Sequence, residues 1–198
     1  MLAISSEDLY QEYVVNNLTD AKIAEKYKVD RTYISKLRKQ VGIETRLNTG
    51  LIGENSVENK LNELGVVFMN MNTLSMTYEY DFLINNRLKI EVKSAKVMPD
   101  GIFRFTLSEK PENNNIVSDT RIRLKNGRTR KRFERTCDFV ILVCLEEDNE
   151  ANCYVIPSNE INTKQQTISI SSSLNGKYAI YKDRWDFLLE EHFKEVMK

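Results

Sequence analysis

The sequence predicts an α/β protein with a mixed central β-sheet flanked by helices, preceded by a small all-helical domain. Three observations support this fold class. Residues 7–46 carry apolar side chains at helical spacing and show no strand pattern. Residues 78–96 alternate apolar and polar side chains as a β-hairpin does. Residues 138–145, DFVILVCL, form a continuous apolar run that is typical of a buried central strand.

Composition limits the classes of protein that need consideration. The chain has 198 residues and zero formal net charge, enough for one sizeable domain or a small one joined to a medium one. No apolar run approaches the ~18 residues of a membrane span, and the N-terminus lacks a signal-peptide pattern. We therefore expect no membrane association. Cys137, Cys144 and Cys153 lack C-x-x-C spacing, which favours reduced thiols in a cytoplasmic protein.

The chain has too few histidines for most histidine-based metal or catalytic sites. His192 is the single histidine, and we interpret it as a helix-surface residue near the C-terminus. A Cys/His zinc finger, a histidine metal cage and a histidine-dependent nuclease site each need more than this chain offers.

The N-terminal region is expected to contain three short helices. SSEDLYQEYVVNN gives the first, with Ser6 as a possible cap and Leu9, Tyr13 and Val14 at helical spacing. Thr19 or Asp20 can cap the second helix, which buries Ile23, Ala24 and Tyr27. Asp30 caps the third, in which Ile34 and Leu37 face inward. Two short helices joined by a tight turn resemble the helix-turn-helix family of DNA-binding units.

The third of these helices carries mainly cationic and hydroxyl side chains on its expected outer face. Such side chains suit a DNA major groove, where Arg and Lys reach guanine edges or phosphates. The alternative is a solvated basic face on a three-helix cap. The expected exposed residues are Arg31, Thr32, Tyr33, Ser35, Lys36, Arg38 and Lys39.

The remainder of the chain alternates helix and strand. Residues 44–53 are interpreted as a linker, and a helix is expected from near Glu54 to Leu64, ended by Gly65. Strands are expected in VVFMN, in the hairpin, in GIFRFTL, and in NCYVIP as the neighbour of the central strand. DRWDFLLEEHFKEVM is expected to close the chain as a helix.

The register of the hairpin can be argued from its apolar residues alone. A two-residue turn at Asn85-Asn86 would mix apolar and charged side chains on both faces. A three-residue turn, 85–87, instead pairs Ile84 with Leu88, Phe82 with Ile90, and Tyr80 with Val92, which gives one apolar face. Asn also tolerates the left-handed backbone that such a turn needs.

That register places Asp81 opposite Glu91, with Lys93 two residues further along the same face. Directly opposed Cβ atoms lie about 5 Å apart. Two carboxylates at this distance repel each other unless a cation or a proton offsets their charge. Lys93 could offset it in part, so a structural ion cluster is an alternative to a metal site. Leu83 shares this face, and we expect the following helices to cover it and leave the acids at a cleft.

In this arrangement the chain resembles the PD-(D/E)xK nuclease superfamily, over roughly residues 52–160. The matching residues are Asp81 and then Glu91-Val92-Lys93, preceded by a helix that opens at Gly53-Glu54. The order of helix acid, hairpin, further strand and buried strand is similar to the branch with homing and restriction endonucleases. Tyr80 stands where the motif has proline, a position that is not a ligand.

The resemblance implies a restriction-endonuclease-like core and a set of roles. Asp81, Glu91 and the Val92 carbonyl would hold Mg²⁺, for which Mn²⁺ would substitute. Lys93 would orient or activate a water and stabilise developing charge. Glu54 would bind a second metal or a metal-bound water, with Glu58 as the rival helix acid. The predicted catalytic residues are thus Glu54, Asp81, Glu91 and Lys93.

Residues 121–136, RIRLKNGRTRKRFERT, contain eight cationic residues and one acid. A solvated loop and a DNA contact are the two interpretations, and proximity to a nuclease site favours DNA. Gly127 suggests the tip of a hairpin. The expected contacts are Arg121, Arg123, Lys125, Arg128, Arg130, Lys131 and Arg132.

Together these features predict a helix-turn-helix DNA-binding domain in residues 1–46 and a nuclease domain in residues 47–198. The leading hypothesis is a Mg²⁺-dependent endonuclease that hydrolyses phosphodiester bonds of double-stranded DNA, aided in site recognition by the first domain. The alternatives are a non-catalytic DNA-binding regulator and a structure-specific repair or junction nuclease. A homodimer is expected because symmetric cutting of a duplex usually needs two active sites. No small-molecule cofactor is expected.

Overall fold

A computed structural model describes residues 4–16, 18–45, 48–75, 78–110, 117–146, 150–171 and 176–189. The chain forms two compact units, Met1–Leu47 and Asn48–Lys198. Within the described ranges, no helix combines the length and the apolar character needed to cross a bilayer.

The first unit is helical throughout its regular elements. The first helix begins one residue earlier than the sequence predicted, because Ser5 rather than Ser6 provides the cap by accepting a hydrogen bond from Asp8 N. Thr19 and Asp30 cap the next two helices, as expected. The elements are α1 (Ser6–Tyr10), which continues into a π-helical segment η1 (Gln11–Val15), α2 (Asp20–Tyr27) and α3 (Arg31–Gln40).

The core of this unit matches most of the expected inner faces, with Tyr27 and Leu37 partly buried against it. Leu9, Tyr13, Ile23 and Ile34 are buried. Val14, expected at helical spacing with Leu9 and Tyr13, is 46% exposed. At about 100° per residue, the five-residue step from Leu9 already turns Val14 well away from the Leu9 side of the helix.

Arg38 corrects another expectation. It was predicted to lie on the exposed face of α3, but its side chain is almost fully buried. Its guanidinium donates to both carboxylate oxygens of Asp20 at 3.0 and 3.1 Å, and to Ile43 O at 2.9 Å. The same group lies 4.4 Å from the centre of the Tyr13 ring. Arg38 therefore ties α2 to α3 and to the segment after α3.

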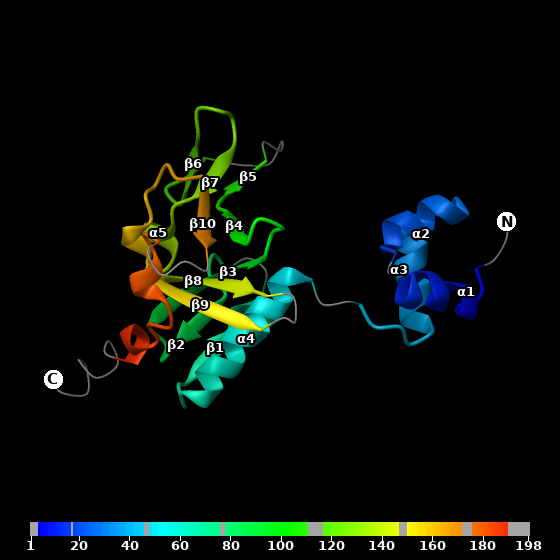
Figure 1. The fold of residues 1–198 in the computed structure, drawn as a ribbon, viewed down its shortest axis with the longest axis horizontal. Coiled ribbons are helices and arrows are strands. Elements are labelled where there is room, and N and C mark those ends of the chain that lie inside the picture. Colours follow the sequence, from blue (N-terminus) through cyan, green and yellow to red (C-terminus); the bar gives the residue numbers. More distant parts are fainter. Residues whose placement is uncertain are drawn as a thin grey trace. The chain divides into compact units, whose positions relative to one another are not determined.

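The second unit is built around a five-stranded mixed sheet (Figure 1). Its order is β1-β2-β3-β8-β9, in which β3 and β8 are parallel and the other neighbours are antiparallel. Every residue of β8 is buried, which confirms the central strand predicted from its apolar run. The elements are α4 (Thr49–Glu63), β1 (Phe68–Asn70), a 3-10 turn η2 (Met71–Thr73), β2 (Phe82–Ile84), β3 (Leu88–Lys96), β8 (Phe139–Leu145) and β9 (Ala151–Pro157).

Two smaller antiparallel sheets accompany the main one, β10-β4 and β5-β7-β6. The hairpin tip predicted at Gly127 is present: β6 and β7 pair antiparallel, and Gly127, with φ +79°, lies in the turn between them. In Figure 1 this hairpin extends away from the main sheet. The elements are β4 (Ile102–Thr106), β5 (Ser108–Glu109), β6 (Arg121–Arg123), β7 (Thr129–Lys131), α5 (Phe133–Thr136), η3 (Ser158–Glu160), β10 (Thr167–Ser171) and η4 (Ala179–Tyr181).

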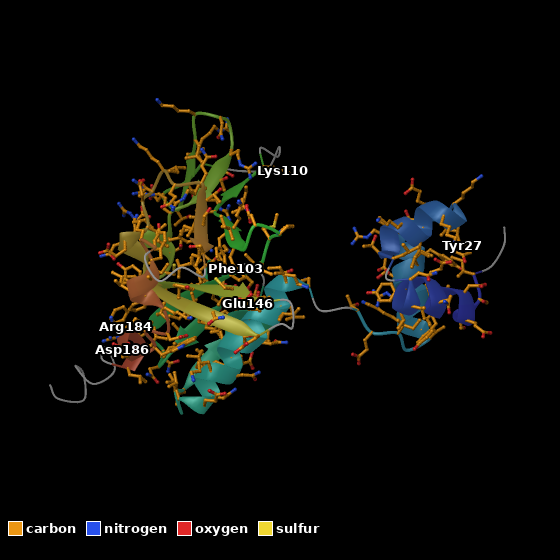
Figure 2. The ribbon with its side chains drawn as sticks, viewed as in Figure 1. Tyr27, Phe103, Lys110, Glu146, Arg184 and Asp186 are labelled. Carbon is orange, nitrogen blue, oxygen red and sulfur yellow. The ribbon has the colours of Figure 1, made fainter. Side chains whose placement is uncertain are left out.

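The main sheet buries a different apolar cluster on each face. On one face Val57 and Leu61 of α4 pack against Ile90 and Val92, with Trp185 in the same cluster. The other face is covered by the smaller sheets and α5; Phe103 of β4 lies there (Figure 2). The cover over this second face, which we call the acid face because Glu91 points to it, is therefore mainly strands. The sequence had led us to expect helices there.

The predicted hairpin register is correct over the paired residues. Phe82 pairs with Ile90 and Ile84 with Leu88. Asn85 and Asn86 both have positive φ, 50° and 55°, so the three-residue turn forms as expected.

The linker is shorter than predicted, because α4 begins at Thr49, capped by Asn48, rather than near Glu54. At the other end, residues 186–189 are helical, and Arg184 and Asp186 form an ion pair there (Figure 2). The remainder of the expected C-terminal helix, including His192, lies outside the described residues.

Candidate active site

Asp81 lies where β2 leaves the main sheet. Its backbone N–H donates to Ile90 O at 2.8 Å, and its carboxylate Oδ2 accepts from Val92 N at 2.7 Å. The Asp81 carboxylate thus accepts the hydrogen bond from Val92 N that a backbone carbonyl of the neighbouring strand would otherwise accept. The register had predicted that Tyr80 pairs with Val92, but this pair does not form. Tyr80 packs instead against the apolar cluster on the acid face.

Glu91 projects from β3 on the acid face and is only 4% exposed. Lys93 donates to its Oε1, and Lys131 Nζ lies 2.7 Å from its Oε2. Lys93, two residues along β3, keeps 34% of its side chain exposed. Both oxygens of Glu91 are therefore held by ammonium groups, one from its own strand and one from β7.

Asn72, on η2, joins the third acid to this group. Its Nδ2 donates to Asp81 Oδ1 at 3.0 Å and to Glu54 Oε2 at 3.1 Å. Glu58, one turn along α4, is instead bound by Asn70 at 3.0 Å. Of the two helix acids that the sequence left open, Glu54 is the one beside Asp81.

Close packing of α4 on β3 sets the position of Glu54. A Cβ at Gly53 would lie 1.8 Å from Ser94 Oγ and 2.8 Å from Ser94 Cβ. No side chain fits there without moving the helix, so glycine is required for this approach. The residue next to Gly53 on α4 is Glu54, and the contact therefore fixes the helix acid relative to β3.

The charges of the site shift the pKa values in different directions. Burial, and then the charge of Glu91, raises the pKa of Asp81 above the usual aspartate value. Burial and the charge of Asp81 likewise raise the pKa of Glu54. Burial also acts to raise the pKa of Glu91, but Lys93 and Lys131 outweigh it and lower that pKa. For Lys93, burial opposes the charged form, but Glu91 outweighs it and raises the pKa, so this side chain is an ammonium at neutral pH.

The donor chemistry of this cluster suits a hard divalent cation. The carboxylates of Asp81 and Glu91 are hard oxygen ligands of the kind that Mg²⁺ prefers. Because the N–H and C=O of one strand residue point to the same side, the Val92 carbonyl faces the side on which its N–H meets Asp81. Among the described residues, no three His, Cys, Asp or Glu side chains are already grouped as a metal cage. The ammonium groups of Lys93 and Lys131 on Glu91 would compete electrostatically with a cation bound there.

The structure gives the predicted DNA contacts different environments. On α3, Arg31, Thr32, Tyr33, Lys36 and Lys39 are exposed, and Ser35 is half-buried. In the hairpin, Arg123 and Lys125 are exposed. The others are engaged within the protein: Arg121 with Glu109, Arg128 with Ser108, Arg132 with Glu134, Lys131 with Glu91, and fully buried Arg130 with Thr163 O.

Two residues of the cluster were not assigned to it from the sequence. Asn72 had no role, and no pattern in MNMNT distinguishes it from Asn70. Lys131 was predicted only as a DNA contact, since nothing in a run of eight cations marks the one that turns toward β3.

Comparisons with known proteins identify the class of fold. No protein-family model matches the chain, and no curated protein matches it. Among solved structures, the chain is similar to an endonuclease-like fold with a mixed sheet flanked by helices.

One such structure is that of a bacterial homing endonuclease, I-Ssp6803I. The similarity has a TM-score of 0.56 at 19% sequence identity, and covers 75% of this chain and 95% of that one. At this identity the likeness concerns the fold.

Proposed function

We propose that this protein is a Mg²⁺-dependent endonuclease that hydrolyses phosphodiester bonds of double-stranded DNA. The observation that carries the proposal is the convergence of Asp81 and Glu91 with Lys93, on two paired strands, beside Glu54 of α4. The fold similarity to a homing endonuclease supports it. A plain sheet has no need to place buried Glu91 near an aspartate that Asn72 joins to a helix acid.

The proposed roles follow from the chemistry of each group. Asp81, Glu91 and the Val92 carbonyl would hold Mg²⁺ or Mn²⁺, and Glu54 would bind a second metal or a metal-bound water. The bound cation would supply a polarised phosphoryl oxygen and an activated water. Lys93, as an ammonium, would stabilise negative charge on the phosphate and orient the attacking water.

DNA binding would use both units. In the first unit, exposed residues of α3 would enter the major groove as the recognition helix of a helix-turn-helix. In the second, Arg123 and Lys125 of the β6–β7 hairpin would contact phosphates. A homodimer would provide two active sites for the two strands.

One observation favours a second candidate, a non-catalytic DNA-binding protein. Both oxygens of Glu91 are bound by lysines, as in a structural ion cluster. In that case the residues of the second unit would only stabilise its fold, and DNA binding by the first unit would be the whole activity.

Cleavage of circular plasmid DNA distinguishes the two candidates. Parent protein, Asp81→Ala and Lys93→Ala are incubated with plasmid in Mg²⁺, Mn²⁺ or chelator, and binding is measured in parallel with Ca²⁺. We expect nicked and linear products only with Mg²⁺ or Mn²⁺, and only from the parent, while both variants still bind DNA. Equal cutting by both variants would refute the site, and metal-independent binding without any cutting would favour the regulator. Preference for branched over linear duplex would indicate a junction nuclease.

A further inference from the structure

Glu91 is bound by two lysines. Lys93 lies on the same strand, β3, whereas Lys131 comes from a different sheet. It lies on β7, in the sheet β5-β7-β6, and its Nζ is 2.7 Å from Glu91 Oε2. Its side chain is 13% exposed, so the ammonium reaches Glu91 through a mostly enclosed position.

The fold of β7 fixes the direction of this side chain. Successive residues of a strand point to opposite faces. Arg130, the preceding residue, is fully buried, donates to Thr163 O at 2.7 Å and lies 5.2 Å from the centre of the Phe133 ring. With Arg130 anchored on one face of β7, Lys131 is directed to the other face, toward β3. The contact with Glu91 is therefore built into the strand.

Neutralising Glu91 does not by itself require Lys131, because Lys93 already binds the other oxygen. The second ammonium also conflicts with a divalent cation at Asp81 and Glu91, since like charges would stand within a few ångströms of each other. A lysine has a flexible four-carbon stem, so its ammonium can exchange one anionic partner for another without movement of the strand. The anion that arrives with the DNA is a phosphate.

We propose that Lys131 is a second phosphate-binding ammonium of the active site, which holds Glu91 in the metal-free protein and transfers to the DNA phosphate when the metal takes Glu91. The inference rests on the proposed nuclease function and adds a residue to it. It also links the β6–β7 hairpin to the site: exposed Arg123 and Lys125 and the inward-facing Lys131 belong to one hairpin. When DNA binds this hairpin, Lys131 therefore moves from Glu91 to a phosphate, and Glu91 becomes free to bind the metal.

The test separates metal binding from DNA chemistry. Mn²⁺ affinity is measured by calorimetry without DNA for the parent, Lys131→Met and Lys131→Arg. Lys96→Met, at an exposed position of β3, removes one charge without touching Glu91 and serves as the control. We expect Lys131→Met to bind Mn²⁺ about fivefold more tightly, because one competing cation is gone. Lys131→Arg and Lys96→Met stay close to the parent.

The same variants are then tested with duplex DNA. In Ca²⁺, the slope of log K against log salt concentration is expected to fall by about one for Lys131→Met and to persist for Lys131→Arg. In Mg²⁺, Lys131→Met is expected to cut at least about tenfold more slowly despite its tighter metal binding. A gain in metal affinity combined with a loss of cleavage is the signature that a merely structural lysine does not produce.

Unchanged or weaker Mn²⁺ binding by Lys131→Met, or an unchanged cleavage rate, overturns the inference. Thermal unfolding checks the variants, and Lys131→Gln, which keeps a donor for Glu91 but no charge, replaces Lys131→Met if the latter fails to fold. If the parent neither binds Mn²⁺ nor cuts duplex DNA, the proposed function fails and the inference fails with it. If the parent binds Mn²⁺ and cuts duplex DNA but Lys131→Met gives either of the overturning results above, the inference alone fails.

Discussion

The carboxylate of Asp81 accepts a hydrogen bond of 2.7 Å from the backbone N–H of Val92. This bond occupies one oxygen and fixes the orientation of the other, which accepts from Asn72 at 3.0 Å. Asp138 makes a comparable contact near the start of β3, accepting from Lys89 N at 2.7 Å. Two aspartates thus make similar structural contacts with β3, but only Asp81 stands beside Glu91 and Glu54.

This pair gives a matched test of Asp81. We expect Asp81→Asn to lower the cleavage rate by at least about a hundredfold, because an amide is a poor ligand for Mg²⁺ and adds no negative charge. Asp138→Asn removes the same charge while its amide oxygen can still accept from Lys89 N, and it should cut like the parent. Single-turnover cleavage with Mg²⁺ measures both. Equal losses in the two variants would show that Asp81 acts through the fold alone.

Metal binding should stabilise the protein through the same residue. A ligand that binds only the folded state, at a concentration about 100 times its Kd, adds about 2.7 kcal/mol to the free energy of unfolding. We therefore expect saturating Mn²⁺ to raise the thermal unfolding temperature of the parent and of Asp138→Asn, relative to chelator. No such rise is expected for Asp81→Asn. A rise of the same size in Asp81→Asn would place the metal elsewhere.

Glu54 and Glu58 provide a second matched pair, one turn apart on α4. Because Asn72 joins Glu54 to Asp81 while Asn70 holds Glu58, Glu54→Gln should reduce cleavage by about tenfold or more and Glu58→Gln should not. Cleavage assays on the two variants decide between them. A larger loss in Glu58→Gln would reverse the assignment of the helix acid.

Gly53→Ala tests whether helix packing positions Glu54. The added Cβ would collide with Ser94, so α4 must shift, at a cost of about 1–3 kcal/mol in the free energy of unfolding. Cleavage should fall as well, since Glu54 moves with the helix. Adding Ser94→Gly removes both atoms of the collision and should restore stability and cleavage together. Urea unfolding and cleavage are the measurements, and a lack of rescue would contradict this explanation.

The pKa shifts predict how cleavage depends on pH. Asp81 and Glu54 must be deprotonated to bind metal, and their raised pKa values mean that cleavage falls on acidification before ordinary carboxyl groups are protonated. The hydrogen bonds from Asn72 lower both pKa values. Asn72→Ala should therefore move the acidic limb of the pH–rate profile to higher pH. A limb that stays in place or moves to lower pH would contradict the role given to Asn72.

The hairpin register and the central strand could be predicted from the sequence because they depend on local patterns. Alternation of apolar residues decided the hairpin register, in which Phe82 pairs with Ile90 and Ile84 with Leu88. The residue before Phe82, Asp81, accepts from Val92 N, next to Glu91 on β3. The apolar run of β8 likewise identified the central strand. Such features follow from periodicity, which a single chain displays without an alignment.

Other relationships depend on contacts between residues far apart in the sequence, which periodicity does not encode. Arg38 and Arg130 look like surface cations, yet each is buried by partners from other segments, Asp20 and Thr163. Asn72 of η2 contacts Asp81 and Glu54, and Lys131 of β7 contacts Glu91 on β3, across long separations in the sequence. The strand predicted in GIFRFTL is β4, and it pairs with the distant β10 in a separate sheet rather than with the main sheet.

The most direct test of the proposed metal-dependent site is a crystal soaked with Mn²⁺ and examined by anomalous scattering. We predict a peak bounded by the carboxylates of Asp81 and Glu91 and by the Val92 carbonyl, on the side of Glu54, with Lys131 displaced from Glu91. Absence of a peak at saturating Mn²⁺, with both lysines still bound to Glu91, would contradict the account and leave a structural ion cluster.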